Sequence, residues 1–277
     1  MEDPVTGAAG AGAGRLFVCV SPEELARAAA GRLWGIVRER AAPPGGGGGS
    51  PRPVTVALSG GKTPRSFLQA LAGPPYRERF PWGFVHFFQV DERWVPPDDP
   101  RSNQRMLRAC LVDKGPVPER NFHPVDTSQP DPVEGAKRYE DHLRRFFPDP
   151  PGGVPRFDAV FLGLGEDGHT ASLFPGSPAL EEENAWVTHA VGGSPRTSRV
   201  TLTLPVLNAA FRVIFLVSGA GKAGVLRELL LGKGGGGHPA ALVAPKRGKV
   251  TFLADADAAS RIPPAEAAYP GGEGGAG

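Results

Sequence analysis

The chain has 277 residues, of which 40% are hydrophobic and 22% charged, a composition that is ordinary for a globular protein with a sizeable core. Its net charge of +2 and its scattered lysines and arginines give no indication of a nucleic acid or acidic partner. No apolar stretch approaches the roughly 20 residues that a membrane helix needs, and the first residues lack the apolar core of a secretory signal. We therefore expect a cytoplasmic protein without a membrane or nucleic acid partner.

Glycine-rich tracts divide the sequence into a folded part and tails. Residues 1–14, the tract 43–53 and the tail 263–277 are predicted to be flexible, because glycine-rich runs bury too little apolar area to offset their ordering entropy. The tract 232–237 is predicted to be a short surface connection. Since strands and helices alternate in the same way on either side of each tract, we expect a single domain over residues 15–262.

Apolar strands and amphipathic helices alternate along the chain. The first strand is expected at 15–20, followed by a helix with Ser21 as N-cap, Pro22 at its first position and Glu24 completing a capping box. The other strands are expected at 53–59, 84–90, 157–164, 199–204, 212–218 and 249–254. The other helices are expected at 63–72, 103–112, 133–147 and 222–231. Two cysteines, Cys19 in the first strand and Cys110 in a helix, are expected to be small buried hydrophobes, which fits a reducing compartment.

This alternation predicts a three-layer, doubly wound α/β fold with a mainly parallel sheet and helices on both faces, because the strands are apolar almost throughout. In such folds the ligand site lies beyond the carboxyl ends of the strands, near a switch in strand order. We therefore expect the functional residues to follow Ser59, Val90, Leu164 and Ser218.

A small-residue turn follows the second strand and opens a helix. Backbone N–H groups at a helix N-terminus can bind an anion, and glycines allow it to approach closely. The candidate phosphate-binding residues are Ser59, Gly60, Gly61, Lys62 and Thr63. The string GKT does not make a nucleotide-binding P-loop, because the position that needs the first glycine holds Val56. A glycine turn without a ligand is the alternative.

Three further strand ends carry charge. Arg93 could hold a phosphate or carboxylate bidentately, and a solvated charged loop is the alternative for this stretch. Asp91 and Glu92 beside it are adjacent, so on a strand end they point in opposite directions and make a poor acid–base pair. Lys222 stands in the first turn of a helix, where a positive charge is unfavourable for the helix dipole and suggests an anionic ligand. Arg199 opens a strand and could point to either end of the sheet.

The loop GLGEDGHTASLFP, residues 163–175, begins with the pattern G-x-G-x-x-G. A dinucleotide site needs a helix after the third glycine, and Pro175 leaves no room for one. His169 is better placed for proton transfer, because a neutral imidazole at a strand's carboxyl end can act as a base near pH 7. Asp167 is near enough to orient it, and a purely structural or surface role for His169 is the alternative.

The other histidines show no metal-ligand spacing, and we expect structural roles and no metal. His86 falls in a strand, His142 on a helix, and the remaining three (His123, His189 and His238) in predicted loops.

The segments LSGGKTP, DERWVP, FLGLGEDGHTASLFP, RVTLTLPVLNAA and SGAGKA together resemble, in this order, the 6-phosphogluconolactonase family, whose fold is similar to that of glucosamine-6-phosphate deaminase. The resemblance spans residues 15–262. It implies hydrolysis of 6-phospho-glucono-1,5-lactone to 6-phosphogluconate in the oxidative pentose phosphate pathway, with no metal or cofactor. Lys62 departs from the family, which more often has a small hydroxyl residue at that position.

The resemblance also implies roles for single residues. His169 would be the general base that activates water, and Asp167 would position it. The Ser59–Thr63 loop would hold the phosphate together with Arg93, Arg199 and Lys222. We expect a monomer or a weak homodimer.

Two alternatives share this fold. An amino-sugar phosphate deaminase and isomerase carries a glutamate five residues after the loop histidine, where this chain has Phe174. A non-catalytic sugar-phosphate sensor, as found in transcription regulators, carries a helix-turn-helix before the core, for which the fourteen residues before the first strand are too few. A catalytically inactive sugar-phosphate-binding protein stays open as an alternative.

Overall fold

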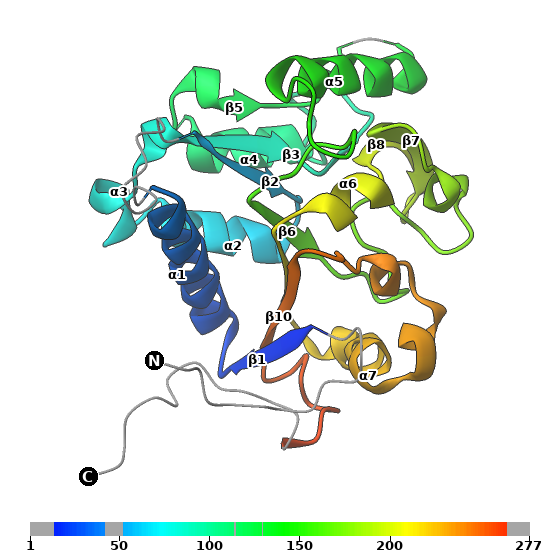
Figure 1. The fold of residues 1–277 in the computed structure, drawn as a ribbon. Helices are drawn as coiled ribbons and strands as arrows, with labels where there is room; N and C mark the ends of the chain where they lie inside the picture. Colours follow the sequence, from blue (N-terminus) through cyan, green and yellow to red (C-terminus); the bar gives the residue numbers. More distant parts are fainter. Residues whose placement is uncertain (1–13, 42–51, 114, 129, 265–277) are drawn as a thin grey trace.

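The computed structural model describes residues 14–41, 52–113, 115–128 and 130–264, which form two sheets flanked by helices (Figure 1). The predicted flexible tails and most of the tract 43–53 lie outside these residues. None of the helices in the described ranges is both long and apolar enough to cross a membrane.

The larger sheet is seven-stranded and parallel, which agrees with the predicted mainly parallel sheet, although its strand Phe122–His123 was not predicted. Its strands, in spatial order, are β1 (Arg15–Cys19), β10 (Lys249–Asp255), β9 (Arg212–Val217), β6 (Ala159–Gly163), β2 (Val54–Leu58), β3 (Val85–Gln89) and β5 (Phe122–His123).

Strand order reverses between β2 and β6. From β2 the chain runs outward through β3 to β5, and it then returns to place β6 on the other side of β2. The two strands pair in register at Leu58 and Phe161, and Ser59 N–H continues the pairing to the Phe161 carbonyl at 3.0 Å. The loops after β2 and β6 therefore border the crevice in which parallel α/β sheets bind their ligands.

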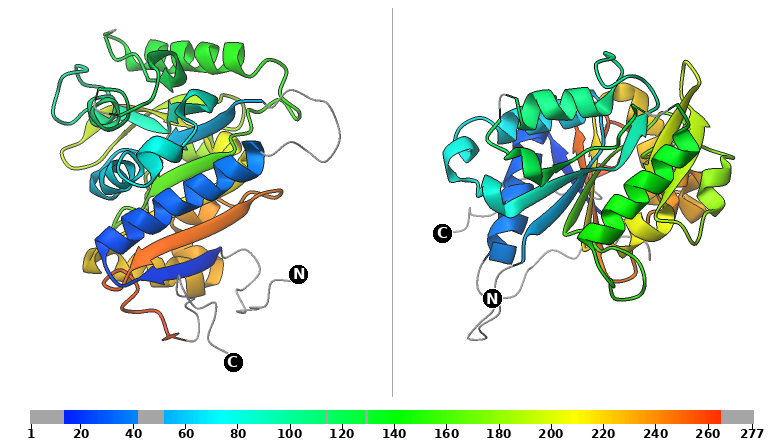
Figure 2. Two further views of the ribbon diagram at one scale, coloured as in Figure 1. Left: turned by 90° about the vertical axis from the view of Figure 1, so that its left-hand side faces the viewer. Right: turned by 90° about the horizontal axis from the view of Figure 1, so that it is seen from above.

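Helices cover both faces of this sheet, which gives the three predicted layers (Figure 2). One core contains side chains of α1 (Pro22–Ala41), α2 (Lys62–Leu71) and α4 (Asn103–Leu111), and the other those of α5 (Pro132–Phe146), α6 (Leu204–Ala209) and α7 (Ala223–Leu231). Neighbouring residues of β3 show the alternation, because Phe87 belongs to the first core and Phe88 to the second. The short helix α3 (Tyr76–Arg79) and the 3-10 turns Trp82–Phe84, Glu119–Asn121, Pro178–Glu181, Ala220–Lys222, Lys233–Gly237 and Pro239–Leu242 complete the elements.

The strand predicted at 199–204 is not part of the parallel sheet. It is β8 (Thr197–Leu202), the centre of a separate antiparallel sheet with β4 (Asp91–Arg93) and β7 (Val187–Gly192). The reason is the short connection between β7 and β8, since a tight turn joins antiparallel strands whereas a parallel pair needs a long crossover. This small sheet contacts α5 and brings β4 and β8 towards the carboxyl ends of the large sheet.

Local features at the start of the chain agree with the sequence. The Ser21 hydroxyl accepts a hydrogen bond from Glu24 N–H at 3.2 Å, and the Glu24 carboxylate accepts one from Val20 N–H at 2.6 Å. Cys19 is fully buried, but Cys110 is only half-buried, so the expectation of two buried thiols is met at one of them.

Candidate active site at the carboxyl ends of the strands

Residues 163–175, called the histidine loop below, make a tight turn after β6. Gly165 N–H donates to the His169 carbonyl at 2.8 Å, and Gly168 N–H donates to the Gly165 carbonyl at 3.1 Å. Gly168 has a φ of +78°, a left-handed conformation that favours glycine. The glycine pattern is followed by a turn and not by the helix of a dinucleotide site. The turn places His169 next to the crevice at the end of β6.

His169 is paired with Asp167 in this turn. Its Nδ1 lies 2.5 Å from Asp167 Oδ1, which also accepts the His169 backbone N–H at 3.1 Å. Burial would raise the pKa of Asp167, but its hydrogen bonds with His169 outweigh that effect and lower the pKa below its ordinary value. Because an ionised carboxylate only accepts hydrogen bonds, Nδ1 carries the proton and Nε2 keeps its lone pair. The neutral ring can therefore accept a proton at Nε2.

Phe174 packs against the other side of this histidine. The two rings lie 4.5 Å apart between centroids, and the Arg199 guanidinium lies 5.2 Å from the Phe174 ring centre. Phe174 is buried, so the position that carries a glutamate in deaminases here contributes an apolar wall to the site.

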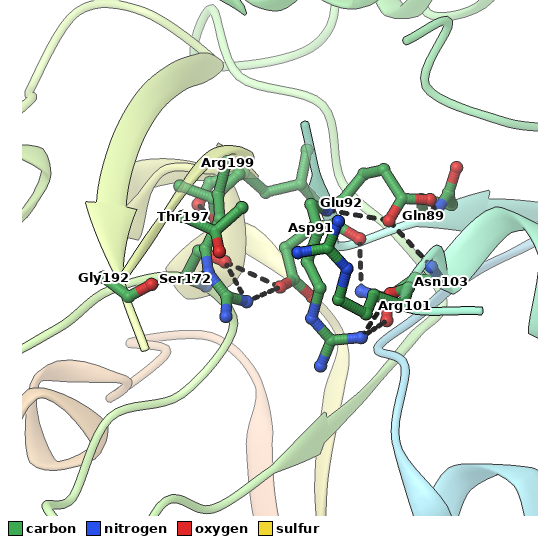
Figure 3. Close-up of polar contacts among 12 residues, drawn as sticks. Gln89, Asp91, Glu92, Arg101, Asn103, Ser172, Gly192, Thr197 and Arg199 are labelled. Atoms are coloured by element: carbon green, nitrogen blue, oxygen red, sulfur yellow. Dashed lines mark hydrogen bonds and ion pairs between the residues drawn. The ribbon is translucent and has the colours of Figure 1, made fainter. Parts of the chain in front are cut away.

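A buried polar cluster connects Ser172 of the histidine loop to Asp91 and Arg199 (Figure 3). Ser172 Oγ donates to Asp91 Oδ2 at 2.7 Å, and Arg199 Nη1 lies 3.5 Å from Ser172 Oγ and 3.9 Å from Asp91 Oδ2. Arg199 Nε also donates to the Gly192 carbonyl at 3.2 Å. Burial lowers the pKa of Arg199, and Asp91 opposes that effect. The Arg199 side chain thus points towards the carboxyl ends of the strands, where it connects β8 to the histidine loop through Ser172.

The carboxylates after β3 are buried, which excludes the alternative of a solvated charged loop. Glu92 is fully buried below the N-terminus of α4, where its carboxylate accepts N–H groups of Asn103 at 2.7 Å and Gln104 at 2.5 Å. Burial raises the pKa of Glu92, while these backbone donors oppose the rise. A carboxylate at a helix N-terminus is favourable, and here it fixes the position of β4 and thereby of Arg93.

Arg93 lies next to the predicted phosphate loop. Its Nη1 donates to the Arg101 carbonyl at 2.6 Å and to Asn103 Oδ1 at 3.1 Å. The Asn103 amide also packs directly on Gly60, where an added Cβ would overlap it, so the close approach requires glycine at that position. Asn103 therefore joins Arg93 to the loop after β2.

The predicted phosphate loop itself forms the start of α2. Gly61 has a φ of +112° and caps the helix, which begins at Lys62. Lys62 is exposed and Thr63 half-buried, and Ser59 is buried with no hydrogen-bond partner for its Oγ among the described residues. The unpaired hydroxyl and the first N–H groups of a ten-residue helix together suit an anion.

Lys222 approaches the histidine loop from the opposite side. Its Nζ lies 3.8 Å from Glu166 Oε1, and the Glu166 carboxylate also packs near Gly221. The turn that carries Lys222 is fixed from below by Asp255, which accepts Gly219 N–H at 3.0 Å. The carboxylate of Glu166 is exposed, and exposed ion pairs are weak. An anionic ligand could therefore replace Glu166 as the partner of Lys222.

The glycine tract 232–237 is exposed, as predicted, but it leads to a contact that the sequence did not indicate. Gly168 in the histidine loop packs on the His238 ring, and the Gly168 carbonyl accepts Ala240 N–H at 3.0 Å. His238 Nε2 is held by Glu228 Oε2 at 2.6 Å. This segment thus supports the outer side of the turn that carries His169.

Three of the remaining histidines form a separate group, called the histidine array. His123 lies at the centre, with its Nε2 2.8 Å from His86 Nδ1 and its Nδ1 2.8 Å from His142 Nε2. His123 belongs to β5 and His189 to β7, so the prediction that these two lie in loops is wrong. No group of three or more potential metal-ligating side chains was found within the described ranges.

The structure thus links most of the predicted site residues. Glu166 connects the histidine loop to Lys222, Ser172 connects it to Arg199, and Asn103 connects Arg93 to Gly60. Lys62 and Thr63 lie at the same edge of the sheet at the start of α2. Sequence reasoning missed the linking residues Asp91, Ser172, Asn103, Glu166 and His238, although Ser172 and Glu166 belong to the histidine loop itself.

Comparison with known proteins identifies the family of the chain. Residues 21–252 match the family model described as glucosamine-6-phosphate isomerases/6-phosphogluconolactonase. A Synechocystis protein named 6-phosphogluconolactonase is 42% identical over 211 residues, which is 76% of this chain and 85% of that protein.

Solved structures are similar over almost the whole chain. The 6-phosphogluconolactonase from Trypanosoma cruzi superposes with a TM-score of 0.78 at 31% identity, covering 92% of this chain and 98% of that one. A monomeric glucosamine-6-phosphate deaminase superposes with a TM-score of 0.73 at 21% identity, covering 89% of this chain and 99% of that one, and it shares the fold alone.

Proposed function

We propose a mechanism for this chain, which belongs to the glucosamine-6-phosphate isomerase/6-phosphogluconolactonase family and hydrolyses 6-phosphogluconolactone in the pentose phosphate pathway. In this mechanism His169 is the general base that activates water for attack on the lactone carbonyl. The observation that supports this role is the 2.5 Å contact between His169 Nδ1 and Asp167 Oδ1, which leaves Nε2 as the basic nitrogen.

The reaction proceeds through proton transfers at His169. As the water oxygen bonds to the carbonyl carbon, one water proton moves to His169 Nε2, and Asp167 stabilises the imidazolium that forms. When the bond between this carbon and the ring oxygen breaks, the imidazolium returns the proton to the departing oxygen. The product is 6-phosphogluconate, and the step uses neither a covalent enzyme intermediate nor a metal or cofactor.

The phosphate of the substrate is held away from the reacting carbon. We assign it to the N-terminus of α2, at Ser59, Gly60, Gly61, Lys62 and Thr63, with Arg93, Arg199 and Lys222 as cationic partners. Arg93 and Lys222 are the better candidates for direct contact, because Arg199 already binds the Gly192 carbonyl and the buried Ser172 and Asp91. Anchoring at the phosphate contributes positioning, which is a large part of catalysis when the lactone is already reactive.

Phe174 argues against the deaminase reaction in this site. Ring opening of an amino sugar phosphate uses a glutamate at that position, and a buried phenyl ring has no proton to transfer. We therefore expect no ammonia release from glucosamine 6-phosphate. A purely binding protein is the second alternative, and turnover separates it from the lactonase.

We further propose that one domain over residues 15–262 acts in the cytoplasm as a monomer or weak homodimer, without a nucleic acid partner. Burial raises the pKa of the Cys19 thiol to about 11, so this thiol stays protonated and unreactive, in keeping with a reducing compartment. Sedimentation of the full chain at several concentrations measures the oligomeric state.

The decisive experiment follows hydrolysis of freshly generated 6-phosphogluconolactone above its spontaneous background, for the wild-type protein and for His169→Ala. We expect kcat to fall by about 10²–10⁴-fold in the variant, which is the usual contribution of a general base. Binding of 6-phosphogluconate, measured by calorimetry, should persist and shows that the fold and phosphate site are intact. Near-wild-type turnover in His169→Ala would refute the general-base role.

A further inference from the structure

A cavity lies at the amino ends of three strands of the large sheet, opposite the ends that carry the candidate active site. Arg15, Arg212 and Lys249 are the first residues of β1, β9 and β10, and all three strands are parallel. Their amino ends therefore lie on the same side of the sheet. The histidine loop and the phosphate loop lie on the other side, after the carboxyl ends of the strands. Helix α1 covers this part of the sheet (Figure 2).

The cavity has a volume of about 700 Å³. Its walls combine apolar side chains with cations, and the residues that matter here, none of them buried, are Phe17, Pro245, Val250, Arg15, Arg32 and Lys249. A cavity of this size, with mostly apolar walls and a few placed polar groups, is typical of small-molecule sites.

Gly35 is exposed at the rim of the cavity. It lies inside helix α1, where glycine costs roughly 1 kcal/mol relative to alanine. A Cβ added at Gly35 would meet no heavy atom within 4 Å, so neither packing nor a positive φ requires glycine there. A side chain at this position would instead enter the space beside the cavity.

The cations of the cavity are only partly neutralised. Arg212 pairs with Glu39 at 2.5 Å, whereas no carboxylate among the described residues pairs with Arg15, Arg32 or Lys249. The Arg32 guanidinium lies 4.0 Å from the centre of the Phe17 ring, which holds it at the cavity wall. Cations fixed against an apolar wall attract an anion that also has an apolar part.

We propose that this cavity binds an organic phosphate with an apolar or aromatic body. The phosphate would pair with the arginines, which recognise phosphate bidentately, and the body would lie against Phe17, Pro245 and Val250, which are only partly buried. A purely apolar ligand would leave the cations without partners, and inorganic phosphate would leave the apolar walls in water. The site is distinct from the candidate active site, because the two lie at opposite ends of the strands.

The test uses ADP as probe and the full chain, with binding measured by calorimetry. We expect wild-type protein to bind ADP with a Kd on the order of 0.1 mM, and adenosine or pyrophosphate at least about tenfold more weakly. Saturating 6-phosphogluconate should leave ADP binding unchanged, since that ligand occupies the other end of the sheet.

A matched pair of variants tests the location. Gly35→Glu and Gly35→Gln are nearly equal in size and both suit a helix, so they differ in the charge added beside the cations. We expect Gly35→Glu to weaken ADP binding about tenfold more than Gly35→Gln, and Arg32→Gln to weaken it as well. Lactone hydrolysis without ADP should be unchanged in all three.

Three outcomes would overturn the proposal. They are no ADP binding up to about 5 mM in the wild-type protein, equal binding by Gly35→Glu and Gly35→Gln, and complete displacement of ADP by 6-phosphogluconate. The last result would place the nucleotide in the candidate active site.

Discussion

His169 and the three histidines of the array have the same side chain but different hydrogen-bond partners. His169 lies in a glycine turn at the crevice, with a side chain 31% exposed and a carboxylate on Nδ1. The histidine array lies at the edge strand β5, where the ring nitrogens of His86, His123 and His142 contact one another. His123 is buried there and stacks on Phe88 with ring centroids 4.2 Å apart.

The partners of each ring decide what it can do. Asp167 lies 2.5 Å from one nitrogen of His169, and in the proposed mechanism it stabilises the imidazolium that forms. In the array, burial and, to a smaller extent, the neighbouring rings of His142 and His86 together lower the pKa of His123 to about 3. The buried His123 ring does not take a proton near neutral pH and serves as a structural element, whereas the proposed mechanism requires His169 to exchange protons.

Asp167→Asn would give His169 a neutral partner, like those in the array. We expect kcat for lactone hydrolysis to fall by about 10²-fold with little change in KM, because the asparagine amide no longer stabilises the imidazolium. Steady-state kinetics at neutral pH measures both constants. Asp167→Glu keeps the charge and should recover part of the lost rate. An Asp167→Asn enzyme with wild-type kcat would show that the carboxylate partner does not distinguish His169 from the histidines of the array.

Gly168→Ala would distort the turn that places His169. The position combines a φ of +78° with direct packing on the His238 ring, so we expect kcat to fall by about tenfold and the free energy of unfolding by about 1–3 kcal/mol. Gly163→Ala is the matched control in the same loop, since an added Cβ there meets no atom within 4 Å. Equal behaviour of the two variants would show that the turn does not depend on Gly168.

His123→Phe would remove the centre of the array while keeping a ring of similar shape. Burial lowers the pKa of His86, His123 and His142, so below the ordinary value near 6.5 the unfolded chain binds more protons than the folded one. Stability is therefore full above pH 6.5 and falls as the pH drops towards the folded-state values.

We expect His123→Phe to reduce this slope by about 1 kcal/mol per pH unit between pH 6 and pH 5, roughly a fivefold change in the unfolding constant. Urea unfolding at several pH values measures it. Lactone hydrolysis at neutral pH should be unchanged, and an unchanged slope would mean that the array does not contribute to acid sensitivity.

The sequence predicted six of the seven strands of the large sheet, because they are apolar and alternate with helices, but it missed the two-residue strand β5. It could not separate β8 from that sheet, since RVTLTL has the same apolar character and only its pairing with β7 and β4 shows the antiparallel arrangement. The sequence left a solvated loop open as the alternative at Asp91, because its partner Ser172 lies 81 positions away.

The candidate site was predictable where one loop carries both partners, as with Asp167 and His169. The array was not predictable, because its three members come from β3, β5 and α5 and only the parallel pairing of β3 with β5 aligns them. Residue type thus identified the histidines, but the fold decides which of them faces a carboxylate.

The protonation state of His169 tests the central claim most directly. Nitrogen-15 NMR of the histidine side chains distinguishes the two neutral tautomers, and comparison with His169→Ala assigns the signal. We expect His169 in its neutral form to carry its proton on Nδ1, with Nε2 unprotonated and free to accept a proton from water. A neutral His169 protonated on Nε2 would contradict the assignment, because that ring would offer water no basic nitrogen.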